Sequence, residues 1–301
     1  MTKQVYLIIV LSIVCVLLSV LSFDLNAQLF HYPGNTYLPK GNLPTSFLLT
    51  LLYFAAFFRS GLHSRLTKTL TLFIVFYVVF AVLTMFANAA QFTPFQPIDR
   101  TILKVELFDL LPIVTWTKQH PTVESVLNHC YDSVHIEMMC IPLLLIAFLK
   151  KEHLYEYCIL ILLTAIIGFG FYYFYPTTGP ASVIDSPYFD FSQRATGIKF
   201  FEMHQHIPPS TRDGGLIALP SFHVIWACLI TYASRPFRLL YWALLPFNAI
   251  IVAACVMLGW HYFTDVFGSM LVLFMAHSFC KMHRATAKWC ETRSEDHPCI
   301  Q

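Results

Sequence analysis

The hydrophobic residues of this chain fall in long, nearly unbroken runs, and the polar residues gather between the runs. A transmembrane helix needs about 20 mostly apolar residues. Eight runs meet or approach that length: 5–23, 43–58, 69–89, 133–149, 157–175, 216–233, 239–258 and 262–280, of which the second is the shortest. No internal repeat divides the chain. The pattern therefore predicts one all-α integral membrane domain over residues 1–301, a polytopic bundle of about eight transmembrane helices.

The first run resembles a secretory leader in its position. Lys3 precedes it, as a basic residue precedes the core of a signal peptide. The run is longer than the usual core of about 7–15 residues, and no small-residue cleavage site follows. We expect it to be retained as the first transmembrane helix.

Basic residues divide unequally between the two sides that eight spans would create, twelve against seven. The larger group is Lys3, Arg59, Arg65, Lys68, Lys150, Lys151, Arg235, Arg238, Lys281, Arg284, Lys288 and Arg293, and the smaller is Lys40, Arg100, Lys104, Lys118, Arg194, Lys199 and Arg212. Cytoplasmic loops carry the excess of Lys and Arg. We therefore expect both termini, with a polar tail at 281–301, in the cytoplasm. The longer loops 24–42, 90–132 and 176–215 then face the periplasm, the exterior or an organelle lumen.

Charged residues interrupt the segment 99–120, so it is not expected to cross the membrane. Leu103, Leu107, Leu110 and Leu111 nevertheless recur at helical spacing. Such a stripe is typical of a helix that lies at the membrane surface. We predict one interfacial helix that braces the top of the bundle.

Composition excludes several classes of protein. Hydrophobic residues make up 57% and charged residues 12% of the chain, whereas soluble domains carry about 25% charged residues. The net charge of +2, without a clustered basic face, argues against nucleic-acid binding. The nine cysteines include no CxxC pair, and most lie in apolar runs, so we expect no disulfide framework.

The first candidate motif is Pro220-Ser221-Phe222-His223, at the start of the sixth run. Proline suits the first turn of a helix. The unpaired N–H groups and positive dipole end of that helix favour an anion such as phosphate. Ser221 adds a hydroxyl donor, and His223 can exchange protons near neutral pH. The motif therefore predicts a phosphate-binding turn with an acid–base group.

The second motif is His261-Tyr262-Phe263-Thr264-Asp265, where the seventh run turns into the eighth. In a helix that starts here, His261 and Asp265 would share a face. The carboxylate can then bind one imidazole nitrogen and leave the other free as a nucleophile. Each motif alone has a plainer interpretation: a histidine that reaches water, or a His–Asp contact that caps a helix. Two such motifs on one side of the membrane favour a catalytic site.

Together the motifs resemble those of the type 2 phosphatidic acid phosphatase superfamily. The resemblance covers residues 131–280, taken as the catalytic core, and includes the segment Tyr172-Tyr173-Phe174-Tyr175-Pro176-Thr177-Thr178-Gly179-Pro180. It is closest to the branch that contains inositol phosphorylceramide synthases and related bacterial membrane enzymes. The resemblance implies a six-helix core. It further implies that His261 attacks phosphorus, that Asp265 orients it, and that His223 protonates the leaving oxygen. It implies no metal and no cofactor.

The sequence departs from the phosphatase branch where that branch has cations. Gly168 and Tyr175-Pro176 stand at the spacing of a Lys and an Arg-Pro, and Ala254-Cys255 replaces a Ser-Arg pair. Phosphoryl transfer needs positive charge around the phosphate oxygens. Arg212, Arg194 and Lys199 lie in the loop before Pro220, and we choose Arg212, with Ser221, as the predicted phosphate ligand. A role for Arg212 as an anchor for lipid headgroups is equally compatible with its position.

Other ionisable residues carry weaker signals. His204 and His206 form an HxH pair, but no acidic or thiolate residues stand nearby at ligand spacing, so we interpret them as loop residues. His135 and Glu137 lie in the fourth run, where they either line the site or pair with each other.

These observations predict a membrane lipid phosphatase or phosphotransferase that acts on a lipid phosphate ester through phosphohistidine. The expected partners are that lipid and the bilayer, without nucleic acid, and the oligomeric state is not predicted. One alternative is transfer of a phospho-headgroup to a lipid alcohol, as in inositol phosphorylceramide synthases. A second is a proton-coupled transporter, which would carry ionisable residues at mid-span in broken helices. A third is an inactive scaffold, against which the retained His, His and Asp argue.

Overall fold

The computed structural model describes residues 3–29, 42–61, 63–205, 207, 209–211, 213–215 and 217–296. Within them the regular secondary structure is all helical and contains no strand. The helices are α1 (Lys3–Leu29), α2 (Asn42–Ser60), α3 (Arg65–Gln91), α4 (Asp99–Val105), α5 (Leu110–Lys118), α6 (Pro121–Ala147), α7 (Lys151–Phe174), η1 (Pro180–Ser182), α8 (Phe191–His204), α9 (Phe222–Ala233), α10 (Arg238–Met257) and α11 (Phe263–Asp296).

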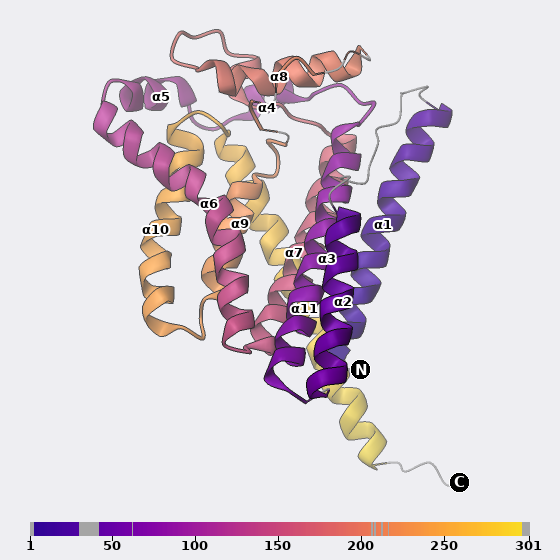
Figure 1. Cartoon of the computed structure of the whole chain (residues 1–301). Coiled ribbons are helices and arrows are strands. Elements are labelled where there is room, and N and C mark those ends of the chain that lie inside the picture. Colours follow the sequence, from indigo (N-terminus) through magenta and orange to yellow (C-terminus); the bar gives the residue numbers. More distant parts are fainter. Residues whose placement is uncertain are drawn as a thin grey trace.

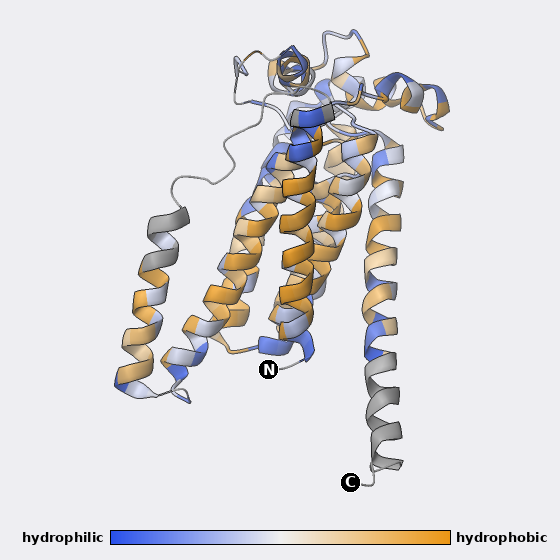
Figure 2. Ribbon diagram, turned by 90° about the vertical axis from the view of Figure 1, so that its right-hand side faces the viewer, coloured by the Kyte–Doolittle hydropathy of each residue, from blue (hydrophilic) through white to orange (hydrophobic). Residues whose placement is uncertain are grey.

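The long apolar helices confirm a polytopic membrane bundle. In the described part of the chain, α1, α3, α6, α7, α10 and α11 are long and apolar enough to cross a membrane, and two shorter apolar helices lie in α2 and α9. All eight correspond to the runs found in the sequence. Figure 2 shows apolar residues filling the long helices, with polar residues concentrated in the layer above them. The protein is an integral membrane protein.

Helix α7 forms the centre of the bundle. In its most apolar stretch, 72% of the residues are buried inside the protein, against 28% for α1, α10 and α11. A helix that is apolar on every side can be covered by lipid or by protein, and most of α7 is covered by protein. Helices α1, α3, α9 and α11 pack around it. Helix α10 packs on α6 and α9, so the short helix α9 is held between α7 and α10.

Several helix ends differ from the predicted runs, and those at the starts of α6 and α9 bear on the site. Helix α6 begins at Pro121, well before the apolar run, because its polar first turns stand above the bundle and need no lipid contact. Helix α9 begins only at Phe222, after Ser221 as its N-cap, and Pro220 precedes the helix instead of opening its first turn. Ile217 to Leu219 are apolar because they face other parts of the protein. Hydropathy alone therefore predicts a membrane helix that starts too early.

The single interfacial helix predicted over 99–120 is two helices, α4 and α5. The Asp109 side chain accepts a hydrogen bond of 3.1 Å from Leu111 N and so starts a new helix. Pro112 fits the first turn of α5, where its missing N–H is not needed. With α8, these helices form a layer across one end of the bundle (Figure 1). The start of α1 and the end of α11 lie at the opposite end.

We predict that the layer of α4, α5 and α8 faces away from the cytoplasm, because of the bias of basic residues. A cysteine at exposed Ser210, in the loop after α8, should react with a membrane-impermeant maleimide in intact cells. A cysteine at exposed Lys151, the first residue of α7, should react only after permeabilisation. The parent protein serves as the control for its native cysteines. The reverse pattern would place the layer on the cytoplasmic side.

Candidate active site

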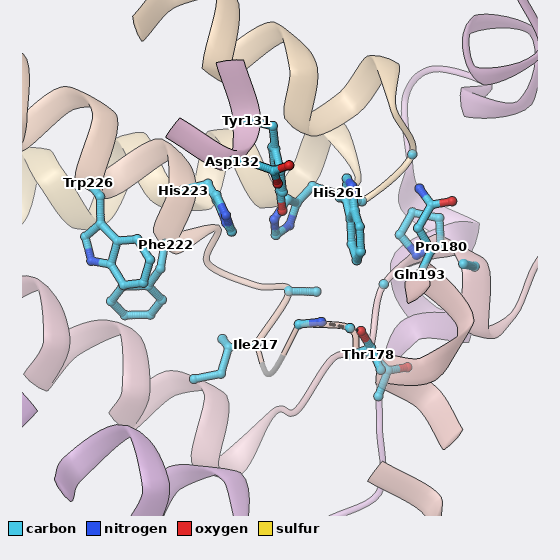
Figure 3. Close-up of a pocket in the computed structure, with 18 of the residues that line it drawn as sticks. Tyr131, Asp132, Thr178, Pro180, Gln193, Ile217, Phe222, His223, Trp226 and His261 are labelled. Carbon is cyan, nitrogen blue, oxygen red and sulfur yellow. Dashed lines mark hydrogen bonds between the residues drawn. The ribbon is translucent and has the colours of Figure 1, made fainter. Parts of the chain in front are cut away.

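A cavity of about 360 Å³ lies under the layer, beside the first half of α6, the end of α7 and the start of α9. His223 and Phe222 come from the start of α9, Tyr131 and His135 from α6, and His261 from the turn before α11. Figure 3 shows Tyr131, Phe222, His223 and His261 around one space, with His223 and His261 on the same side of it. Residues that are far apart in sequence therefore converge on one cavity, and both predicted motifs contribute to it.

His261 is held by Asp265. Its Nδ1 lies 3.2 Å from Asp265 Oδ2, and the same oxygen accepts a hydrogen bond of 3.0 Å from Tyr262 N. Helix α11 starts at Phe263, so His261 precedes the helix and the carboxylate reaches back across the first turn. Asp265 is fully buried and His261 is 4% exposed. A protonated Nδ1 that donates to Asp265 leaves the lone pair of Nε2 available for a substrate.

The helix-capping contact considered from the sequence and the oriented pair are therefore the same arrangement. Asp265 binds the backbone at the start of α11 and the imidazole of His261 with one oxygen atom. Ser269 Oγ donates to Asp265 O at 2.6 Å and lies 3.0 Å from Ser221 O, which ties this turn to the start of α9. The two motifs are joined through α11.

His223 lies next to His261, with ring centroids 6.2 Å apart. Its ring stacks on Tyr131 at 4.0 Å, and Tyr131 is also nearly parallel to Trp260 at 5.6 Å. The Nε2 atom of His223 is buried and has no hydrogen-bond partner among the described residues. Stacking fixes the plane of the imidazole, so this unpaired nitrogen is available to a bound molecule.

His135 is a third imidazole in the cavity. Its ring meets that of His223 edge-on, with centroids 5.3 Å apart. Of the two alternatives from the sequence, lining the site describes His135, whereas Glu137 accepts a hydrogen bond of 3.2 Å from Ser133 Oγ. An imidazole beside His223 can donate a hydrogen bond to an anion that enters the cavity.

Ser221 is engaged in the helix cap. Its Oγ accepts from Val224 N at 3.5 Å and lies 3.9 Å from Cys255 Sγ, and the residue is fully buried. The hydroxyl is not among the groups that line the cavity. The groups that this turn presents to an anion are the backbone N–H groups at the start of α9, where Phe222 and His223 line the cavity. The assignment of Ser221 as a phosphate ligand stays a prediction.

The predicted loop cations have different positions. Arg212 and His206 lie outside the described residues, although Gly214 and Gly215, close to Arg212 in sequence, line the cavity. Arg194 Nη2 donates to Ser186 O at 2.5 Å, and Lys199 Nζ donates to Gly214 O at 3.2 Å. Burial lowers the pKa of Lys199, against the opposing charge of Asp213. Both described cations therefore hold loop backbone.

His204 is the last residue of α8, and both of its ring nitrogens contact backbone carbonyl groups. Its Nδ1 and Nε2 lie 3.1 Å and 3.0 Å from the carbonyl oxygens of Phe200 and Phe95. Its ring stacks on Phe200 at 4.2 Å. These contacts attach the end of α8 to the segment after α3, so His204 is a partly buried helix residue and its interpretation as a loop residue is wrong.

Asp99 joins the walls of the cavity, and no motif in the sequence marks it. Its carboxylate accepts hydrogen bonds of 2.8 Å from Thr178 N, 3.0 Å from Thr178 Oγ1 and 2.8 Å from Gly179 N, and lies 3.5 Å from Tyr262 Oη. Asp99 is 1% exposed, and burial raises its pKa although these hydrogen bonds oppose the shift. Gly179 has φ +90°, and a Cβ there would lie 3.0 Å from Trp260 O. Asp99 thus fixes the backbone beside His261. An aspartate at a helix start is too common to be distinctive.

We expect Asp99→Asn to lower kcat/KM by about ten- to a hundredfold, because a buried hydrogen-bond donor left without its acceptor costs about 1–3 kcal/mol. The amide would turn its NH₂ group toward N–H donors of Thr178 or Gly179. Asp109→Asn, at the exposed N-cap of α5, is the matched control and should change activity little. Equal activity of the two variants, at equal thermal stability, would exclude this role for Asp99.

The fold and the cavity define a helical membrane protein with paired histidines at one end of its bundle. A family model described as the PAP2 superfamily matches residues 101–279, which include His223, His261 and Asp265. The chain belongs to the PAP2 superfamily, and membership indicates a phosphatase-type lipid phosphoesterase. The searches of curated proteins and of solved structures gave no match.

Proposed function

We propose that the protein transfers the phosphoryl group of a lipid phosphate ester through a phosphohistidine at His261. The observation that carries this proposal is the cavity itself, in which His261 is oriented by Asp265 at 3.2 Å and His223 stands beside it with an unpaired Nε2. A nucleophile, its orienting group and an acid–base group are the parts that covalent phosphoryl transfer needs.

In the first step, the lone pair of His261 Nε2 attacks phosphorus. The N–P bond forms while the P–O bond to the lipid breaks, and protonated His223 gives its proton to the leaving oxygen. The lipid alcohol is released. In the second step, water or an alcohol attacks phosphorus and gives its proton to neutral His223 while the N–P bond breaks. His261 is regenerated, and protons and charge balance over the cycle.

Positive charge around the phosphate comes from protonated His223 and from the N-terminal end of α9. The ring of His135 lies edge-on to the ring of His223. Arg212 is proposed as a further ligand for the phosphate oxygens, because its neighbours in the chain, Gly214 and Gly215, line the cavity. The mechanism proposed here uses no metal and no cofactor.

The acceptor decides between a phosphatase and a phosphotransferase. The cations of the phosphatase branch are replaced here by Gly168, Tyr175-Pro176 and Ala254-Cys255, which favours the branch that includes inositol phosphorylceramide synthases. A proton-coupled transporter fits less well. Its relay would need ionisable residues through the middle of the membrane. His223, His261 and Asp265 instead stand at the starts of α9 and α11, which face the non-cytoplasmic side in our proposal.

Turnover by the purified protein in lipid nanodiscs tests this function. We expect release of phosphate from one or more lipid phosphates in excess chelator, or its transfer when a candidate alcohol is added. A matched preparation of His261→Ala controls for contaminating phosphatases. Activity that chelator abolishes and Mg²⁺, Mn²⁺ or Zn²⁺ restores would contradict the metal-free mechanism.

A further inference from the structure

A second cavity, of about 450 Å³, lies deeper in the bundle between α9, α10 and α11. Ala227 and Thr231 of α9 form one wall, and Leu245 and Asn248 of α10 form another. Met270 of α11 completes the lining. It shares no described lining residue with the cavity of His223 and His261. Most of its lining is apolar, and a cavity of this volume is large enough for a small organic ligand.

The mouth of this cavity opens sideways, toward lipid. Leu245 and Met270 are 41% and 42% exposed, and Ala249 is also exposed. These residues lie on helices that cross the membrane, and Asn248 stands near the midpoint of α10. A molecule would therefore enter from the hydrocarbon part of the bilayer, so the expected occupant is a lipid.

The inner wall carries a polar group that lacks a partner. Asn248 is 4% exposed, and its Nδ2 donates to Thr231 Oγ1 at 2.8 Å, while Thr231 Oγ1 donates to Ala227 O at 2.9 Å. Asn248 Oδ1 has no partner among the described residues. A buried acceptor away from water is costly unless a donor reaches it.

Charge at the cavity argues against a lipid phosphate as the occupant. Arg235 is the only charged residue in the described lining. Its guanidinium is 3.0 Å from Glu156 and lies over the ring of Tyr232, 3.2 Å from the centroid. Glu156 is bonded to Arg284 as well. The cation is thus already engaged, and the unpaired group of the cavity is an acceptor, which a phosphate oxygen cannot satisfy.

We propose that this cavity binds an uncharged lipid alcohol, whose hydroxyl donates a hydrogen bond to Asn248 Oδ1. This inference rests on the proposed function, because cleavage of a lipid phosphate at His261 produces such an alcohol. A charged phosphate holds its lipid at the membrane surface, since burial of the charge in hydrocarbon is costly. The alcohol carries no charge, so its hydroxyl can leave the surface, and the cavity offers it an acceptor at depth.

Photolabelling tests this site without turnover. The probes are a diacylglycerol with a diazirine in one chain and the matching phosphatidic acid, each applied to His261→Ala in nanodiscs. We expect the diacylglycerol probe to label α10 and α11 near Leu245, Ala249 and Met270, with competition by unlabelled diacylglycerol. Asn248→Leu, which removes the acceptor at similar volume, should reduce this labelling about tenfold. The phosphatidic acid probe should label the site much less.

A second variant keeps the test decisive if Asn248→Leu does not fold. Ala249→Phe should block the mouth and abolish the labelling, whereas Ala243→Phe, on an exposed part of α10 outside the cavity, should not. Labelling unchanged by both Asn248→Leu and Ala249→Phe, or equal labelling by the two probes, would overturn the proposal. Because His261→Ala cannot turn over in the proposed mechanism, specific labelling without any phosphoenzyme in the native protein would contradict the proposed function and leave the lipid site standing.

Discussion

His261→Ala should abolish the phosphoenzyme with every substrate and lower the rate by a factor on the order of 10⁶, the cost of removing one member of a cooperating catalytic group. The imidazole is the only group that the proposed mechanism uses to bond phosphorus. Its neighbour Asp265 is fully buried, so the variant also leaves a carboxylate oxygen without its imidazole partner. Thermal stability must therefore be measured alongside activity.

The measurement is a rapid quench with radiolabelled lipid phosphate, followed by a search for acid-labile, base-stable phosphate on the protein. His129→Ala removes an exposed histidine of α6 and serves as the control, with full labelling expected. Asp265→Asn should give an intermediate loss, because His261 stays in place but is poorly oriented. Label that persists in His261→Ala, or that moves to Ser221, would refute the assignment of the nucleophile even if all variants were inactive.

Much of the fold could be predicted from the sequence, because the bilayer imposes a length on every helix that crosses it. The runs that became α1, α3, α7 and α10 were found in this way. Hydropathy predicts a transmembrane helix for 217–221 that is not there, because it cannot distinguish apolar residues that face lipid from those that face protein. Ile217 and Ala218 line the catalytic cavity, and Leu219 is buried between helices. Pro220 and Ser221 then start the helix later than the apolar run does.

The candidate site was predictable where its chemistry lies in short motifs. His223, His261 and Asp265 could be selected because each stands beside a span end in a recognisable order. The supports of these residues could not be selected, since they depend on contacts between distant segments. Asp99 reaches Thr178 and Gly179 across the layer, and Tyr131 stacks on His223 from another helix. A lone Asp or Tyr in a single sequence carries no sign of such contacts.

If His223 protonates the leaving oxygen, the loss of rate in His223→Ala should depend on the leaving group. With a lipid phosphate, the leaving alkoxide is strongly basic and needs a proton, so the loss of a general acid should cost about 10²–10⁴ in rate. An aryl phosphate releases a weakly basic phenolate that needs little protonation. His223→Ala should therefore form the phosphoenzyme from p-nitrophenyl phosphate at nearly the native rate, while His261→Ala forms none.

The second step separates the acid role of His223 from a purely structural one. Water or an alcohol still has to lose a proton when it attacks the phosphoenzyme, so His223→Ala should accumulate the intermediate from p-nitrophenyl phosphate and turn it over slowly. Burst kinetics measure both steps in one experiment. Tyr131→Phe is the matched control, because it keeps the ring that stacks on His223 at 4.0 Å and should keep the native profile. A variant His223→Ala that is equally slow in forming the phosphoenzyme from aryl and lipid phosphates would show that His223 positions the site instead of protonating the leaving oxygen.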